Sequence, residues 1–149
     1  MNYLLIGGAD NILKVQVAHQ YAQKLQKSAD FDLMENQIPD KETERFWCVF
    51  KNRITQKCVL VNSELLSPEV LARIEHFKSD YAPDNTIVTL ISAADAPDRD
   101  LLMERYEVMP SDTAVEISLD DMANSQESRL KHISDQIENI LSKPPFNLL

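Results

Sequence analysis

The sequence predicts a three-layer α/β domain, in which helices cover both faces of a five-stranded, mainly parallel sheet. Short apolar runs rich in Val and Ile alternate along the chain with longer segments whose apolar residues recur at helical spacing. No repeat or low-complexity tract interrupts this series, and 149 residues is a common length for one domain. We therefore expect a single α/β domain over residues 1–141, followed by a short tail over residues 142–149.

Five short apolar runs are the expected strands. Uninterrupted runs of this kind are typical of strands that are buried on both faces of a sheet. The second run has polar flanks, which is typical of an edge strand. The predicted ranges are 3–6, 31–34, 58–61, 86–91 and 114–118.

Five helices are expected between and after these strands. The third has the clearest start, because Ser67 can cap it, Pro68 suits its first position and Glu69 adds a negative charge to its first turn. The last has a strict stripe of Leu and Ile opposite a charged face. The predicted ranges are 11–27, 39–54, 67–81, 98–106 and 125–141.

The segment 39–54 has two interpretations. Its first part is rich in helix formers, and Phe46, Trp47 and Phe50 then follow one helical stripe. The stretch 46–50 is also rich in residues that favour strands. We expect the helix.

Strands that alternate with helices in this way imply right-handed crossovers between parallel strands. Five such units without a dinucleotide fingerprint suggest the flavodoxin-like strand order 2-1-3-4-5, and open sheets of this class bind ligands at the carboxyl ends of their strands. The residues expected at those ends are the candidate ligand-binding residues: Gly7, Gly8, Asp10, Asn62, Ser63, Glu64, Ser92 and Asp95.

Three of these candidates are acids with two alternative roles. Asp10, Glu64 and Asp95 could converge on one divalent cation, because hard cations favour clustered carboxylates. They could equally cap the helices that follow the strands. Capping is the role that we expect, so no metal ligand is assigned.

The sequence contains no motif that would identify a reaction. Gly7-Gly8 lacks the third glycine of the dinucleotide motif and the Lys-Ser/Thr pair of the P-loop. No serine lies in a Gly-x-Ser-x-Gly elbow, and the histidines His19, His76 and His132 all fall within predicted helices. We therefore assign no catalytic residue and expect no cofactor.

The composition limits the partners that we expect. The 24 acidic and 15 basic residues give a net charge of −9, which opposes binding to nucleic acids and to anionic membranes. The longest apolar run is far shorter than the roughly 20 residues of a membrane-spanning helix. The first residues lack the basic region of a signal peptide, so we expect a cytoplasmic protein. Cys48 and Cys58 are then expected to be reduced and packed in the core.

Asn62 closes the third predicted strand, and Ser92-Ala93 closes the fourth strand thirty residues later. Asp10 follows the first strand, and a long amphipathic helix ends the domain. Over about residues 1–141 this pattern resembles the receiver domain of bacterial response regulators, whose matching positions hold a phosphorylated aspartate, a Ser or Thr, and acidic metal-binding residues. Asn62 cannot form an acyl phosphate, and the receiver's lysine after the fifth strand is missing. The resemblance therefore implies a degenerate receiver that cannot be phosphorylated.

The leading functional hypothesis is a non-enzymatic regulatory or protein-interaction module with a protein partner, of which a homodimer is one form. Receiver-like domains usually pair through their fourth and fifth strands and helices, so the expected interface residues are Leu101, Leu102, Tyr106 and Met109. One alternative is a small metal-dependent enzyme or ligand binder that uses the acids at the strand ends. The other is an accessory subunit of a larger complex, with the tail 146–149 docking into a partner.

Overall fold

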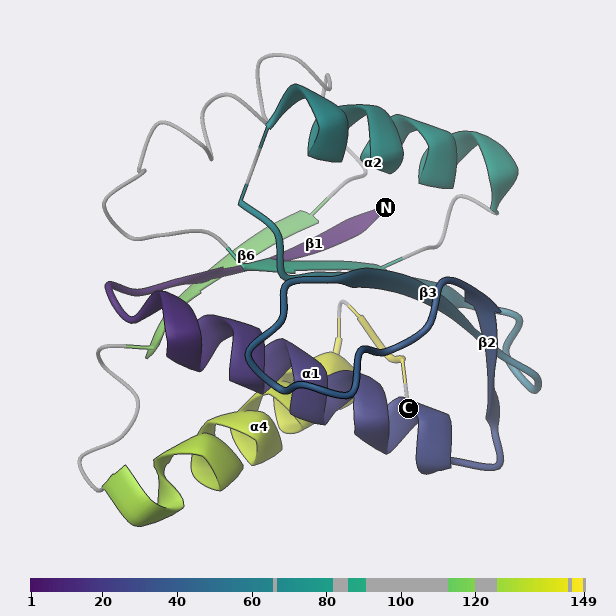
Figure 1. The fold of residues 1–149 in the computed structure, drawn as a ribbon. Helices are drawn as coiled ribbons and strands as arrows, with labels where there is room; N and C mark the ends of the chain where they lie inside the picture. Colours follow the sequence, from purple (N-terminus) through teal and green to yellow (C-terminus); the bar gives the residue numbers. More distant parts are fainter. Residues whose placement is uncertain (66, 82–85, 91–112, 120–125, 145, 149) are drawn as a thin grey trace.

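The structure is a computed structural model of the chain, and it describes residues 1–65, 67–81, 86–90, 113–119, 126–144 and 146–148. In chain order the described elements are β1 (Asn2–Gly7), α1 (Asn11–Lys27), β2 (Phe31–Glu35), β3 (Trp47–Asn52), β4 (Cys58–Asn62), α2 (Pro68–Asp80), β5 (Thr86–Leu90), β6 (Thr113–Ser118) and α4 (Gln126–Ser142). Figure 1 shows the sheet lying between α2 on one face and α1 with α4 on the other. Within the described ranges, no helix is long and apolar enough to cross a membrane.

The sheet is mixed and has six described strands in the order β2-β3-β4-β5-β1-β6. The strands β4, β5, β1 and β6 are parallel neighbours, whereas β3 is antiparallel to both β2 and β4. The predicted five-stranded, mainly parallel sheet with the flavodoxin-like order 2-1-3-4-5 is therefore wrong. The prediction of helices on both faces of a sheet is correct.

The missing strand in the prediction is β3, which lies inside the segment 39–54 that the sequence pattern assigns to a helix. Side chains of β3 alternate between the two faces of the sheet: Cys48 and Phe50 join the cluster beneath α1 and α4, while Trp47 and Val49 pack in the cluster beneath α2. Because both faces of β3 are covered, apolar residues fill almost every position, and such a run imitates a helical stripe.

The strand order differs because β1 pairs with β5 and β6 and not with β2. In the two parallel ladders, Leu4 is the register partner of both Val88 and Val115. The strands β2, β3 and β4 instead form an antiparallel meander, which places β2 at the far edge. The expectation that the second strand is an edge strand is confirmed.

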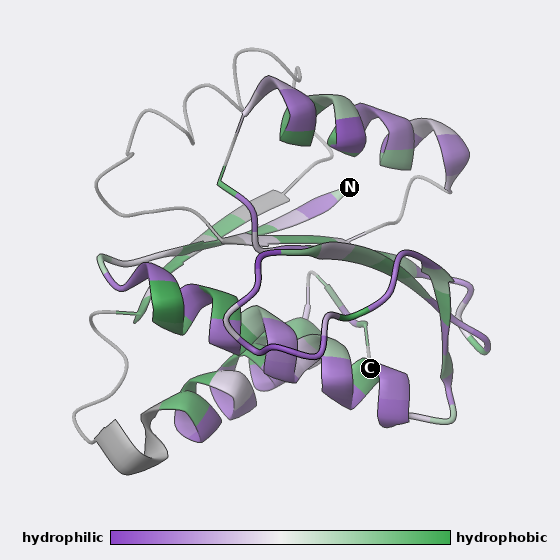
Figure 2. Cartoon of the chain, in the orientation of Figure 1, coloured by the Kyte–Doolittle hydropathy of each residue, from purple (hydrophilic) through white to green (hydrophobic). Residues whose placement is uncertain are grey.

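Three of the predicted helices are confirmed to within one residue at each end by α1, α2 and α4. Their local signals work as expected, because the Asp10 side chain caps α1 and the Ser67 side chain caps α2. Figure 2 shows the apolar sides of these helices turned toward the sheet. The predicted helix 98–106 lies outside the described residues.

The core consists of two apolar clusters, one on each face of the sheet. Leu4 and Ile6 of β1 point toward α1 and α4, and Tyr3 and Leu5 point toward α2. The C-terminal tail belongs to the first cluster, because the Phe146 and Leu148 side chains are 1% and 0% exposed there. A partner that docked on this tail would have to displace both side chains from the core of the chain itself.

The C-terminal ends of β1, β4 and β5 lie at one edge of the sheet, which we call the carboxyl edge. The connection 36–46 leaves β2 at this edge and crosses α1 before it enters β3 (Figure 1). A ring nitrogen of His19 lies 2.7 Å from the Pro39 carbonyl oxygen, and the Gln16 amide donates to the Glu42 carboxylate at 3.2 Å. The carboxyl edge is therefore bordered by three described segments: 7–10, 36–46 and 63–65.

Candidate functional site

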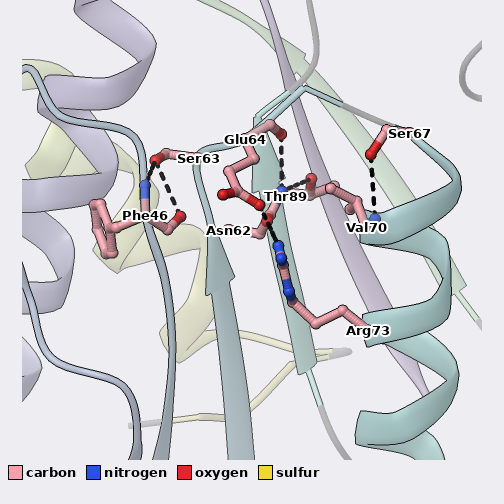
Figure 3. A network of polar contacts seen from close by, with 8 residues as sticks. All are labelled: Phe46, Asn62, Ser63, Glu64, Ser67, Val70, Arg73 and Thr89. Carbon is pink, nitrogen blue, oxygen red and sulfur yellow. Dashed lines mark hydrogen bonds and ion pairs between the residues drawn. The ribbon is translucent and has the colours of Figure 1, made fainter.

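The candidate site lies at the carboxyl edge, where Asn62 and Glu64 contact Arg73 in the N-terminal half of α2. Figure 3 shows this region: Asn62 and Glu64 belong to one polar network with Arg73 and Thr89, and Ser63 bonds separately to Phe46. Ser92 and Asp95, and the proposed interface residues Leu101, Leu102, Tyr106 and Met109, lie outside the described residues.

The loop between β1 and α1 is built to start a helix. Gly8 has a φ of 151°, a value that favours glycine, and it is buried at the turn from strand to helix. The Asp10 carboxylate accepts a hydrogen bond from the Leu13 N–H at 3.0 Å, which satisfies one of the free donors in the first turn. The capping role that we expect for Asp10 is therefore confirmed, and Gly7 ends β1 directly before this turn.

Asn62 is the centre of the network and is only 1% exposed. Its side-chain NH₂ group donates to the Glu64 carbonyl oxygen at 2.9 Å and to the Thr89 hydroxyl at 3.1 Å. Its carbonyl oxygen accepts a hydrogen bond from Nη1 of Arg73 at 3.0 Å. Both ends of the amide are therefore used within the chain, as expected for a buried polar group.

Arg73 connects α2 to this network. Its guanidinium carbon lies 4.6 Å from the centre of the Trp47 ring, which is a cation–π contact. The same Nη1 that donates to Asn62 also forms an ion pair with the Glu64 carboxylate. The Arg73 side chain is 16% exposed and that of Glu64 is 36% exposed, so this ion pair lies at the border between the core and solvent.

Ser63 does not face the other candidates but holds the start of β3. Its hydroxyl accepts from the Phe46 N–H at 2.8 Å and donates to the Phe46 carbonyl oxygen at 3.1 Å. The Ser63 N–H donates to the same carbonyl at 2.9 Å. These bonds extend the β3–β4 ladder by one residue pair beyond Trp47 and Asn62.

Sequence reasoning identified Asn62 and Glu64 but missed Arg73, Thr89 and Trp47. Thr89 and Trp47 are the register partners of Asn62 in β5 and β3. The predicted order already placed the strands of Asn62 and Thr89 side by side, whereas Trp47 reaches the site only through β3, which the prediction assigned to a helix. Arg73 lies beside the apolar stripe of α2, so the sequence pattern predicts that its side chain is turned toward the sheet. The pattern does not predict which residues the side chain contacts.

A metal centre has no support in the described part of the chain, where no group of three His, Cys, Asp or Glu residues is placed to hold an ion. The histidines have other surroundings: His19 is buried edge-on to Phe46, His76 lies 2.8 Å from the Asp80 carboxylate, and His132 is exposed on α4. The prediction that the histidines are packing or surface residues is thus consistent with their positions.

Both thiols are packed as predicted. Cys48 and Cys58 are buried thiols, and they belong to clusters on opposite faces of the sheet. Burial raises the pKa of Cys48 to about 12, and it also raises the pKa of Cys58. Neither thiol has the low pKa that a nucleophile or a metal ligand needs.

Comparison of the chain with protein-family models, with curated proteins and with solved structures found no match.

Proposed function

We propose that this chain is a non-enzymatic regulatory or protein-interaction module. The observation that supports the proposal is the internal use of four polar side chains in the described part of the carboxyl edge. Asp10 caps a helix, Asn62 makes three hydrogen bonds within the chain, Ser63 holds Phe46, and Glu64 pairs with Arg73. An enzyme needs reactive groups there that are directed at a substrate. These four are directed at the protein itself.

A second observation suggests which surface a protein partner would use. Ile12 is 62% exposed and Leu65 is 38% exposed. Ile12 follows β1 and Leu65 follows β4, so both lie at the carboxyl edge. We propose that a protein partner would cover these two side chains, because burying exposed apolar surface favours association.

We place this module in the cytoplasm, because Cys48 and Cys58 are buried as thiols and not as a disulfide, which is typical of a reducing compartment. The net charge of −9 favours a basic partner over an acidic one. The pairing of two copies of the chain through Leu101, Leu102, Tyr106 and Met109 stays a prediction.

The test compares the double variant Ile12→Asp/Leu65→Asp with the control Ile54→Asp. Ile54 is 75% exposed and lies in the β3–β4 turn, at the opposite edge of the sheet. Each tagged protein is used to isolate partners from the source cells, and the partner is then purified and titrated by calorimetry. We expect the double variant to lose at least about tenfold in affinity, which equals about 1.4 kcal/mol, and Ile54→Asp to bind like the wild type.

Calorimetry with Mg²⁺ and Mn²⁺ separates this proposal from the metal-dependent enzyme. We expect no binding heat from either ion. Heat that the substitution Asp10→Asn abolishes would instead mean that Asp10 binds a metal ion, and it would contradict the non-enzymatic proposal.

A further inference from the structure

The guanidinium of Arg73 is held in place by contacts that do not depend on its ion pair. It lies over the Trp47 ring at 4.6 Å and donates to the Asn62 amide oxygen at 3.0 Å. Asn62 is itself fixed by its bonds to Thr89 and to the main chain of Glu64. Removing the Glu64 carboxylate would therefore leave a positive charge that keeps its position at the carboxyl edge.

The guanidinium also has donors to spare. In the described part of the chain, two groups accept hydrogen bonds from this guanidinium: the Asn62 oxygen and the Glu64 carboxylate. Both accept from Nη1. Nε and Nη2 of Arg73 have no acceptor among the described residues. The planar fork of an arginine suits two oxygens of one carboxylate or phosphate group, so the pairing with Glu64 uses only part of its capacity.

Glu64 is the more exposed partner of the pair. Its side chain is 36% exposed and has three rotatable bonds, while its main-chain carbonyl is held by Asn62. The Glu64 carboxylate is therefore the partner that can turn into water while Arg73 stays against Trp47 and Asn62. Another anion can therefore replace this carboxylate without any change in the backbone.

We propose that Arg73 is a binding site for a small oxyanion, and that the Glu64 carboxylate occupies this site when the ligand is absent. The ligand class is a carboxylate or phosphate group that can accept hydrogen bonds from two nitrogens of Arg73. The net charge of −9 opposes the approach of a polyanion, so the site selects a small anion. This inference is independent of the protein-interaction function, because oxyanion binding can be measured without a partner.

Trp47 provides the readout, because it is the single tryptophan of the chain and Arg73 lies over its ring. Its fluorescence is followed while inorganic phosphate, or separately acetate, is added at constant ionic strength. The proteins are the wild type, Glu64→Gln and the control Glu69→Gln. Glu69 is an exposed acid in the first turn of α2 and has no ion pair among the described residues, so its substitution changes the net charge equally.

We expect Glu64→Gln to bind phosphate about tenfold more tightly than the wild type, and Glu69→Gln to bind like the wild type. The added substitution Arg73→Lys should abolish this gain, since lysine lacks the planar fork. The tighter of the two anions identifies whether a phosphate or a carboxylate ligand is preferred.

Equal affinities of Glu64→Gln and Glu69→Gln would overturn the proposal, because the gain would then be an effect of net charge. A gain that persists after Arg73→Lys is added would overturn it as well. If the protein that carries Arg73→Lys fails to fold, the proposal is tested by NMR on the Glu64→Gln protein, in which the Arg73 Nε–H resonance is followed. This resonance must shift as phosphate is added, and a constant position contradicts the proposal.

Discussion

Ser63 and Phe46 are joined by three hydrogen bonds, two of which use the serine hydroxyl both as an acceptor and as a donor. Both residues are buried, so the Phe46 N–H has no access to water as a substitute partner. A serine side chain thus completes a sheet ladder at the point where the connection 36–46 enters β3. This position makes Ser63 a structural residue at the edge where a ligand-binding residue was expected.

We expect Ser63→Ala to lower the free energy of unfolding by about 1–3 kcal/mol, because the buried Phe46 N–H loses its acceptor. Urea denaturation measures the loss, and hydrogen exchange at the Phe46 amide should become faster. Ser79→Ala is the control, since Ser79 is exposed on α2 and should change stability by no more than about 0.5 kcal/mol. Similar effects of the two substitutions would contradict this account.

The amide donors of Asn62 can be tested with the acid of the same shape. An aspartate keeps an acceptor for Arg73, but it has no NH₂ group to donate to the Glu64 carbonyl or the Thr89 hydroxyl, and it adds a buried charge. We expect Asn62→Asp to cost about 1–3 kcal/mol of stability at pH 7. Gln23→Glu on the exposed side of α1 adds the same charge and should be nearly neutral. An Asn62→Asp protein as stable as the wild type would show that the amide donors are dispensable.

The sequence predicts the helices well and the sheet poorly, for a physical reason. The starts of α1 and α2 are set by Asp10 and Ser67, whose capping bonds reach only three residues along the chain. Strand order depends on pairing between distant segments, and no local pattern contains it. The same difference between local and long-range contacts applies to the candidate site. Asn62 could be found as a strand end, whereas its contact with Arg73 requires the correct sheet and the packing of α2 on it.

The C-terminal tail is expected to be part of the folding unit, because Phe146 is 1% exposed within the main core cluster. The Lys57 ammonium also donates to the carbonyls of Phe146 and Asn147, at 3.4 and 3.1 Å. We expect Phe146→Ala to destabilise the protein by about 3–5 kcal/mol in urea denaturation. Lys143→Ala, at an exposed position near the start of the tail, is the control. A small effect of Phe146→Ala would mean that the tail leaves the core easily and is available to a partner.

The buried thiol of Cys48 should make stability depend on pH in the alkaline range. Its pKa rises from an ordinary value of 9.0 to about 12 on folding, so the folded state binds the proton more tightly than the unfolded state does. The thiol therefore contributes its full stabilisation below pH 9, and this contribution is lost as the pH rises from 9 toward 12. The expected slope for this one group approaches about 1.4 kcal/mol per pH unit. Cys48→Val, which keeps a buried apolar side chain, should remove that slope. Urea denaturation between about pH 8 and pH 10 measures the difference, and parallel curves for the two proteins would show that the Cys48 pKa is not raised by folding.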